Sequence, residues 1–103
     1  MNDVRPPVRA AQEIARAREI VARHELPDFI TGFEIELGEM EGEPALYVVY
    51  SAAPFDGAPG QDEILRRAEA YGQIDHVILT ELLHAFEDRL PYSKIVRADP
   101  SAG

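Results

Sequence analysis

The sequence predicts an α+β fold of the order α-β-β-α-β, with a small antiparallel three-stranded sheet and two helices on one face. Two observations carry this prediction. Between Phe29 and Ser51, two apolar segments with strand-like patterns flank a short acidic turn. On either side, residues 6–25 and 62–89 show the 3.6-residue apolar period of amphipathic helices. A short apolar segment after Pro91 supplies the third strand.

The chain of 103 residues is expected to form one domain, with residues 1–6 and 98–103 disordered. It contains no cysteine, which excludes disulfides and thiolate metal sites. No apolar run approaches the roughly 20 residues needed to cross a bilayer. The N-terminal segment MNDVRPPVRA lacks the apolar core of a signal peptide. We therefore expect a soluble, cytoplasmic protein.

The first helix is predicted from Pro6 and Pro7, which suit a first turn, to Glu25, before Pro27. Its composition is rich in alanine, arginine, glutamate and isoleucine, all of which a helix tolerates. At 100° per residue one face gathers the apolar positions and ends on a histidine. That stripe contains Ala10, Ile14, Ala17, Ile20, Val21 and His24.

A β-hairpin is predicted next. In its first arm Phe33, Ile35 and Leu37 alternate with acidic residues, as in a strand with one buried face. The second arm, residues 45–50, is apolar on both faces, which is typical of a strand inside a sheet or one covered by a partner. Gly42 is the expected positive-φ residue of the turn.

Residues 62–89 give the strongest helical pattern, and we favour one continuous helix over two. The apolar phase survives Gly72, although a glycine there costs about 1 kcal/mol. The alternative ends one helix at Gly72 and caps a second at Asp75. The stripe contains Ile64, Ala68, Tyr71, Asp75, Ile78, Leu82 and Phe86.

The last strand is predicted in the segment YSKIVR, after Pro91 has ended the helix. A right-handed return would place it beside the first strand and antiparallel to it. The uncovered face of the sheet would then carry Glu34 and Glu36.

The formal net charge of −9 is confined to one part of the chain. Residues 28–63 hold nine acidic residues and no Lys or Arg, while the two flanking parts nearly balance. A polyanion such as nucleic acid is therefore not an expected partner. Two main interpretations remain: a solvated face that keeps the sheet from aggregating, or a docking surface for a basic protein. Calcium binding is a third and less favoured interpretation, because the EF-hand spacing of alternate carboxylates with a closing glutamate is absent. The docking residues would be Glu34, Glu36, Glu39, Glu41 and Glu43.

No metal or cofactor site is expected. His76 and His84 are eight residues apart, about 12 Å along a helix, too far to share a metal ion. The Glu81-x-x-His84 pair is one quarter of a di-iron helix motif and occurs once. The glycines of residues 52–61 lack the spacing and the lysine of a phosphate loop.

Asp75 interrupts the apolar stripe of the second helix, and His24 ends the stripe of the first. If the helices pack side by side, both enter one apolar layer, where a carboxylate needs a partner. One hypothesis is an acid–base pair with shifted pKa values. The alternatives are a helix cap at Asp75, a buried ion pair, or exposure of both groups at the edge of the layer.

Association is also predicted. On the second strand either Tyr47 and Val49 or the opposite set of side chains needs cover, and Ile74 and Val77 lie off the main stripe of the long helix. Apolar patches of this kind mark interfaces more often than isolated exposed residues do. We expect a homodimer formed by sheet-face or helix packing.

The segments GEMEGEPALYV, Gly38–Val48, and LPYSKIV, Leu90–Val96, resemble those of small bacterial α-β-β-α-β proteins. Those proteins are similar in having an acidic hairpin turn before Pro-Ala-Leu and a closing strand that begins with Pro-Tyr. The resemblance implies the same element order and carries no activity or site residues.

The leading functional hypothesis is a non-enzymatic protein-interaction or regulatory module of the inhibitor, antitoxin or immunity type, acting through the acidic hairpin. The alternative is a small enzyme or ligand-binding domain with a site at a dimer interface near Asp75 and His24.

Overall fold

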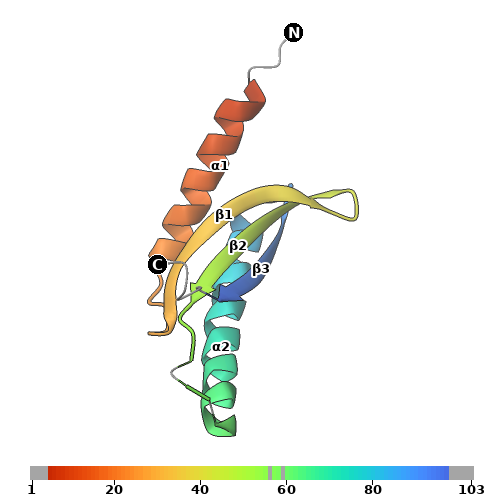
Figure 1. Ribbon diagram of the computed structural model, residues 1–103. Coiled ribbons are helices and arrows are strands. Elements are labelled where there is room, and N and C mark those ends of the chain that lie inside the picture. The colour runs from red at the N-terminus through yellow and green to blue at the C-terminus, as the bar shows by residue number, and fades with distance from the viewer. Residues whose placement is uncertain (1–4, 56, 59, 98–103) are drawn as a thin grey trace.

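The computed structural model describes residues 5–55, 57–58 and 60–97. The element order is the predicted α-β-β-α-β (Figure 1). The five elements are α1 (Arg5–Ala22), β1 (Ile30–Met40), β2 (Glu43–Ala52), α2 (Gln61–Ala85) and β3 (Leu90–Arg97). Of the segments predicted to be disordered, residues 1–4 and 98–103 lie outside the described residues, whereas Arg5 and Pro6 belong to α1.

The sheet order differs from the prediction. The strands lie in the order β1-β2-β3, with β1 and β2 antiparallel but β2 and β3 parallel, so the sheet is mixed rather than antiparallel. The helix α2, 25 residues and therefore about 37 Å long, returns the chain to the end where β2 began. Such a crossover joins neighbouring parallel strands. The central place belongs to β2 because it alone is apolar on both faces.

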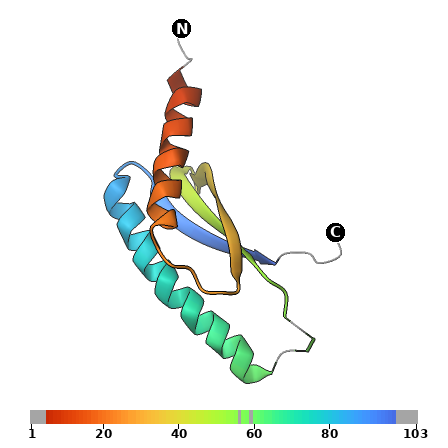
Figure 2. The same ribbon diagram turned by 90° about the vertical axis from the view of Figure 1, so that its left-hand side faces the viewer.

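Both helices cover the same face of the sheet and share one core with it (Figure 2). From the strands, Ile35, Leu46, Val48 and Tyr50 point into this core. The helices add Ala17, Ile20 and Val21 of α1 and Ile78, Leu82 and Phe86 of α2. The small and branched residues of the α1 stripe therefore lie where the sequence pattern placed them.

The helix α2 is continuous through Gly72, as predicted. A Cβ at this exposed glycine would meet no atom within 4 Å, so neither a close approach nor a break requires it. The first turns extend past the sheet (Figure 1), and Ile64 and Leu65 are 47% and 57% exposed. The helix ends at Ala85, where the Phe86 N–H donates to the Leu82 carbonyl.

The hairpin closes in a two-residue turn formed by Glu41 and Gly42. Met40 and Glu43 are the last paired residues, and φ is 54° at Glu41 and 85° at Gly42. Two consecutive positive φ values define a type I′ turn, whose twist matches that of the strands. The expected positive φ of Gly42 is confirmed. Glu41 is the residue under strain, because a side chain disfavours this region.

Replacing Glu41 with asparagine should raise the free energy of unfolding by about 0.5–1 kcal/mol, because Asn-Gly is the preferred type I′ pair. Urea denaturation followed by circular dichroism measures the change. The matched control is Glu39→Asn, which removes the same charge from an extended strand position near the turn. An equal gain in both variants would assign the effect to charge repulsion rather than to the backbone.

Candidate functional site

The face of the sheet without helices is the side turned toward the viewer in Figure 1. The strand register places side chains on it in rows: Glu36, Tyr47 and Tyr92 form one row. The next row contains Glu34, Val49 and Lys94. We call this surface the open face: Glu34, Glu36, Tyr47, Val49, Tyr92, Lys94 and Val96.

Tyr47 is the centre of the open face. Its ring stacks against Tyr92 with centroids 5.8 Å apart, and it lies 3.4 Å from the position that a Cβ on Gly38 would take. The Tyr47 hydroxyl donates to the Glu39 carbonyl at 3.0 Å. The ring is therefore fixed on both sides and presents a rigid aromatic surface.

The open face already holds one cation. The Lys94 ammonium lies 5.0 Å from the Tyr47 ring centroid and 3.9 Å from Glu36 Oε1. An aromatic face and a carboxylate together attract a cation, by about 0.5–1 kcal/mol for the ring at an exposed site. The open face also carries a further ring, Tyr92 on β3, and a further carboxylate, Glu34 on β1, which lie in different rows with β2 between them.

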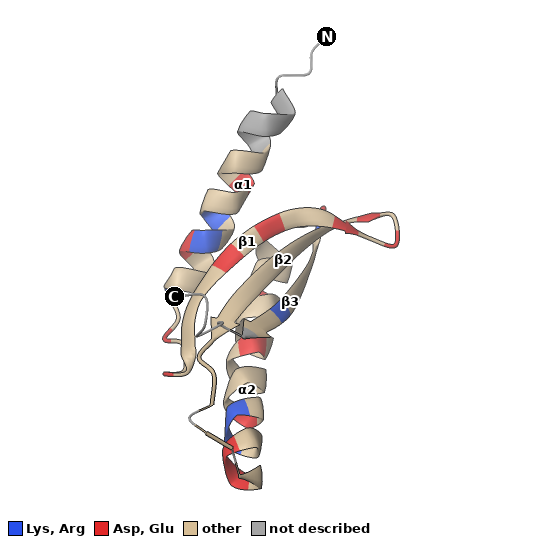
Figure 3. Ribbon diagram, in the orientation of Figure 1, with Lys and Arg blue, Asp and Glu red and all other residues tan. Residues whose placement is uncertain are grey.

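The five acidic residues predicted as a docking surface are all exposed, along β1 and around the hairpin turn (Figure 3). Two of them, Glu34 and Glu36, lie on the open face, and the other three, Glu39, Glu41 and Glu43, lie near the turn. Within the described part of the chain, Glu36 is the member of this set that has an ion pair. The hairpin therefore carries a largely uncompensated negative charge.

His24 does not pair with Asp75 as the acid–base hypothesis required. Its Nε2 lies 2.7 Å from Glu81 Oε1, and Arg23 donates to the other oxygen of Glu81 at 3.3 Å. Among the described residues no hydrogen bond or ion pair joins His24 to Asp75. On α2, Asp75 and Glu81 are six residues apart, which is about 9 Å along the helix axis and 120° around it. The hydrogen bond between His24 and Glu81 therefore ties the segment after α1 to α2.

Asp75 instead belongs to a polar cluster between α2 and the sheet, together with Tyr50, Tyr71 and Ser93. The hydroxyls of Tyr71 and Ser93 lie 2.8 Å apart, and the Tyr50 and Tyr71 rings meet edge to face at 5.6 Å. Asp75 Oδ1 and the Tyr50 hydroxyl are both buried, and neither has a hydrogen bond to a described residue. Two orphaned polar atoms in one cluster carry a desolvation cost.

Burial dominates the electrostatics of this cluster. It raises the pKa of Asp75 above its usual value, and the neighbouring Ser93 hydroxyl offsets part of that rise. Burial likewise raises the pKa of Tyr50, with the nearby Asp75 charge adding to the effect. The pKa of Tyr71 is raised for the same two reasons, against the opposing hydrogen bond from Ser93. The cluster thus favours uncharged groups.

On its outer side Asp75 borders a groove of about 430 Å³ between α2 and the start of β3. The groove is lined mainly by apolar residues, among them Leu79, Leu83, Leu90 and Pro91. The imidazole that was expected to face Asp75 lies on Glu81, so the predicted acid–base pair is not assembled there.

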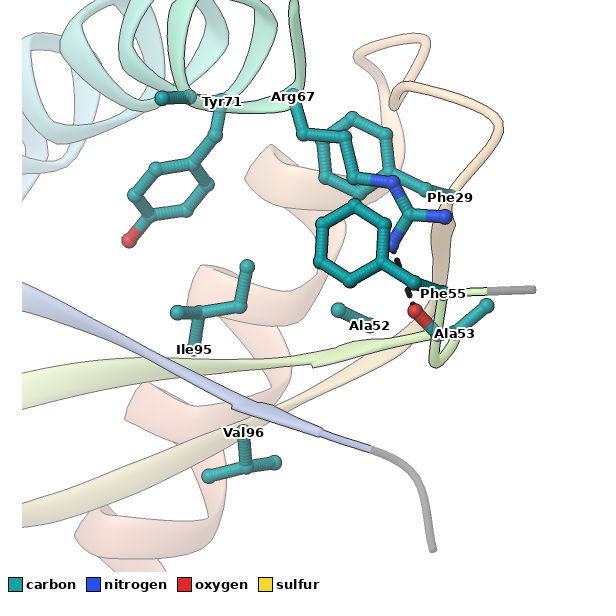
Figure 4. Close-up of a pocket in the computed structure, with 9 residues that line it drawn as sticks. Phe29, Ala52, Ala53, Phe55, Arg67, Tyr71, Ile95 and Val96 are labelled. Atoms are coloured by element: carbon teal, nitrogen blue, oxygen red, sulfur yellow. Dashed lines mark hydrogen bonds between the residues drawn. The ribbon is translucent and has the colours of Figure 1, made fainter. Parts of the chain in front are cut away.

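A second cavity, of about 380 Å³, opens between the N-terminal half of α2 and the C-terminal end of β3 (Figure 4). Its wall is mainly apolar and includes Phe29, Phe55, Tyr71 and Ile95. The one cation in the wall, Arg67, is engaged by its own chain. It donates to the Ala53 carbonyl at 2.7 Å and to Glu63 at 3.2 Å, and it lies 4.2 Å from the Phe55 ring centroid.

Sequence inspection missed Arg67, whose role depends on the loop that folds over α2. Arg67 holds residues 53–55 against α2 and so shapes the cavity. Because Arg67 is engaged by its own chain, the cavity wall keeps few polar groups that could contact a ligand. The arrangement could accept an apolar group, and it contains no nucleophile paired with a base.

A metal site in the described residues would need at least three His, Cys, Asp or Glu side chains within reach of one ion. No group of three or more His, Cys, Asp or Glu side chains there could hold a metal ion. His76 and His84 are both exposed on α2. None of the described helices is both long and apolar enough to span a membrane.

Comparisons of the chain with protein-family models, with curated proteins and with solved structures find no significant match. The resemblance to small bacterial proteins therefore stays a prediction.

Proposed function

We propose that the protein is a non-enzymatic interaction module whose open face and acidic hairpin dock a basic segment of a partner protein. The observation that supports this most is the position of Lys94, held between the Tyr47 ring and the Glu36 carboxylate. The chain itself thus provides an example of how a cationic side chain binds to this face.

The rest of the open face offers further aromatic, apolar and acidic groups, at separate positions. An arginine is the best-suited guest, because its guanidinium stacks on an aromatic ring and also donates to a carboxylate in the same plane. Tyr92 and Val49 offer apolar contact, while Glu34 offers the carboxylate. Glu39, Glu41 and Glu43 extend the negative charge toward the turn and would steer a basic partner into contact.

This geometry suits roles in which a small acidic protein covers a basic surface of another protein, such as inhibitor, antitoxin or immunity proteins. The enzyme hypothesis has less support. It needed a base facing Asp75, and His24 is engaged by Glu81 at 2.7 Å.

A titration with a short arginine-rich peptide tests the proposal, with NMR chemical shifts and calorimetry as readouts at physiological ionic strength. We expect the signals of Tyr47, Val49 and Tyr92 to shift on binding. Reversing both charges with Glu34→Lys and Glu36→Lys should weaken binding at least about tenfold, because each lost contact costs roughly 0.5–1 kcal/mol and each new lysine repels the peptide.

The matched control is Glu69→Lys with Glu87→Lys, which reverses two exposed charges away from the open face. Both double variants have the same net charge, so general attraction to an acidic protein weakens equally in the two. We expect the control to lose no more than about threefold in affinity, through long-range screening alone. Equal losses in the two variants, or shifts spread over all acidic residues, would reject the open face as the docking site.

A further inference from the structure

The two edges of the sheet differ in how they are protected. The β1 edge has the features that discourage pairing with another chain: exposed Glu34 and Glu36, and an irregular register between Ile30 and Gly32. The β3 edge has two residues of the kind that discourage pairing, Pro91 near its start and Lys94, but it has no acidic residue and keeps an unbroken register over its whole length. Its Lys94 is drawn back over the sheet toward Tyr47. The β3 edge is therefore the accessible one.

The β3 edge is also apolar. Leu90, Ile95 and Val96 are 47%, 44% and 46% exposed, on a strand of eight residues. In the described part of the chain β3 pairs with β2 alone, which leaves the backbone donors and acceptors on its other side unpaired by a strand. An apolar strand edge with free backbone groups is a template for another strand.

We propose that two copies of the chain pair their β3 strands antiparallel, about a twofold axis at Ser93, to form one continuous six-stranded sheet. This inference is argued from the free edge of β3 and does not require the proposed docking function, although the side chains of Tyr92, Lys94 and Val96 belong to both surfaces. The acidic β1 strands would then lie at the two outer edges, as far apart as the sheet allows.

The register follows from symmetry. A twofold axis perpendicular to the sheet leaves every side chain on its own face, so residues on the helix-covered face pair only with each other. On β3 the helix-covered face carries Pro91, Ser93 and Ile95. An axis at Lys94 would place two lysines directly opposite each other, which is unfavourable. An axis at Tyr92 would place Leu90 opposite Lys94.

The axis at Ser93 makes each cross-strand pair complementary. Leu90 of one copy lies opposite Val96 of the other, which buries both exposed side chains. Tyr92 lies opposite Lys94, a cation–aromatic pair. Pro91 lies opposite Ile95, and the two serines meet on the axis. No other register of this symmetry pairs the apolar ends of the strand and also separates the lysines.

The same symmetry brings the two α2 helices together on one face of the extended sheet. The groove beside Asp75 lies on the β3 side of α2 and exposes Leu83, which is 46% accessible, along with Leu79 and Leu90. The second copy would cover this groove. The dimer therefore gives a buried environment to apolar side chains that the single chain leaves in water.

Charge alone would also attract β3 to the β1 edge of another copy. That contact is heterologous and does not close, so it would produce filaments that grow with concentration. The bulge near Gly32 interrupts the regular edge that such pairing needs. Light scattering separates the two arrangements, because filaments have no fixed mass.

Disulfide cross-linking tests the register, since the chain has no cysteine of its own. Leu90→Cys and Val96→Cys are made as separate proteins, mixed, unfolded, refolded together and oxidised. Directly opposite residues have Cα atoms about 4.5–5.5 Å apart, within the disulfide range. We expect a cross-linked dimer in the mixture. Each variant alone should give none, because its two thiols would lie about 20 Å apart.

Size-exclusion chromatography with light scattering should give the mass of a dimer for the unmodified protein. Leu90→Glu and Val96→Lys should each weaken the dimer at least about tenfold, and the two together in one chain should restore it, because both cross-strand pairs become Glu–Lys. The control Ile64→Lys changes an equally exposed apolar residue far from β3 and should leave the dimer intact. A monomeric mass, a filament, or a dimer whose mixture of cysteine variants does not cross-link would overturn the proposal.

Discussion

Replacing Leu82 with alanine is expected to lower the free energy of unfolding by about 2–5 kcal/mol, the largest effect of any single change considered. Leu82 is fully buried on α2, where both helices and the sheet meet, and Ile78 and Phe86 belong to the same core cluster. The substitution removes the transfer free energy of the side chain and leaves a cavity that the rigid sheet cannot fill. Urea denaturation measures the loss as a lower midpoint with an unchanged slope.

The informative control is Ile64→Ala, since Ile64 shares the apolar stripe of the same helix. Ile64 lies where α2 extends past the sheet and is 47% exposed (Figure 1). We expect its replacement to cost less than about 1 kcal/mol, because little cavity forms at a half-exposed site. Similar losses in the two variants would show that the stripe is buried along its whole length, contrary to the structure.

This contrast shows what periodicity can and cannot establish. The pattern correctly predicted one long helix through Gly72 and correctly chose Ile78, Leu82 and Phe86 as core residues. It could not show where along the helix the sheet ends. That limit is set by how far β2 and β3 extend under α2, a property of packing rather than of the helix's own sequence.

The predicted strand order was wrong for a related reason. The handedness rule gave the position of β3 beside β1, but the composition of the strands pointed to β2 as the central strand. An acidic strand such as β1 is stable at an edge, where Glu34 and Glu36 remain in water. A strand apolar on both faces is stabilised by neighbours on both sides. Weighing these residues more heavily would have given the observed order.

Only part of the open face, the residues from β1 and β2, could be predicted from the sequence. Glu34 and Glu36 were expected there, together with apolar side chains of the second strand, either Tyr47 and Val49 or the opposite set. The other part depends on the position of β3, because only a strand beside β2 brings Tyr92 and Lys94 to Tyr47. The cation site is thus a product of topology, and no local pattern in the segment LPYSKIVR indicates it.

The partners of Asp75 in the polar cluster were likewise beyond what the sequence pattern could predict. The break in the α2 stripe at Asp75 correctly marked an unusual position, but its expected partner was wrong. His24 reaches Glu81 because the helices cross at a particular register, and no sequence pattern sets that register. Tyr71 and Ser93 join Asp75 from neighbouring elements, which their spacing in the sequence does not reveal.

Replacing Asp75 with asparagine should raise the free energy of unfolding by about 1 kcal/mol at neutral pH, the cost of one unsatisfied buried polar group. Burial disfavours the charged form of the carboxyl at this position, and one of its oxygens is buried without a described partner. The amide is uncharged, so burying it at this position costs less than burying the carboxylate. If the carboxylate instead stabilises the fold through its packing, Asp75→Asn will lower the free energy of unfolding.

The pH dependence follows from the direction of the pKa shift. Burial raises the pKa of Asp75 in the folded state above its unfolded value, so the folded protein binds the proton more tightly. The stability that Asp75 contributes is therefore present in full below the unfolded pKa, about 3.9 for an aspartate, and is lost as the pH rises through the folded value. The advantage of Asp75→Asn should accordingly shrink to near zero at about pH 3, where the wild-type carboxyl is protonated.

Chemical denaturation of both proteins between about pH 3 and pH 7 measures this convergence. Glu69→Gln, which neutralises an exposed carboxylate on the same helix, is the control and should keep a constant difference within about 0.5 kcal/mol. A gap that persists in acid would mean that asparagine stabilises through packing, and burial of the charge would then not be the source of the strain in this cluster.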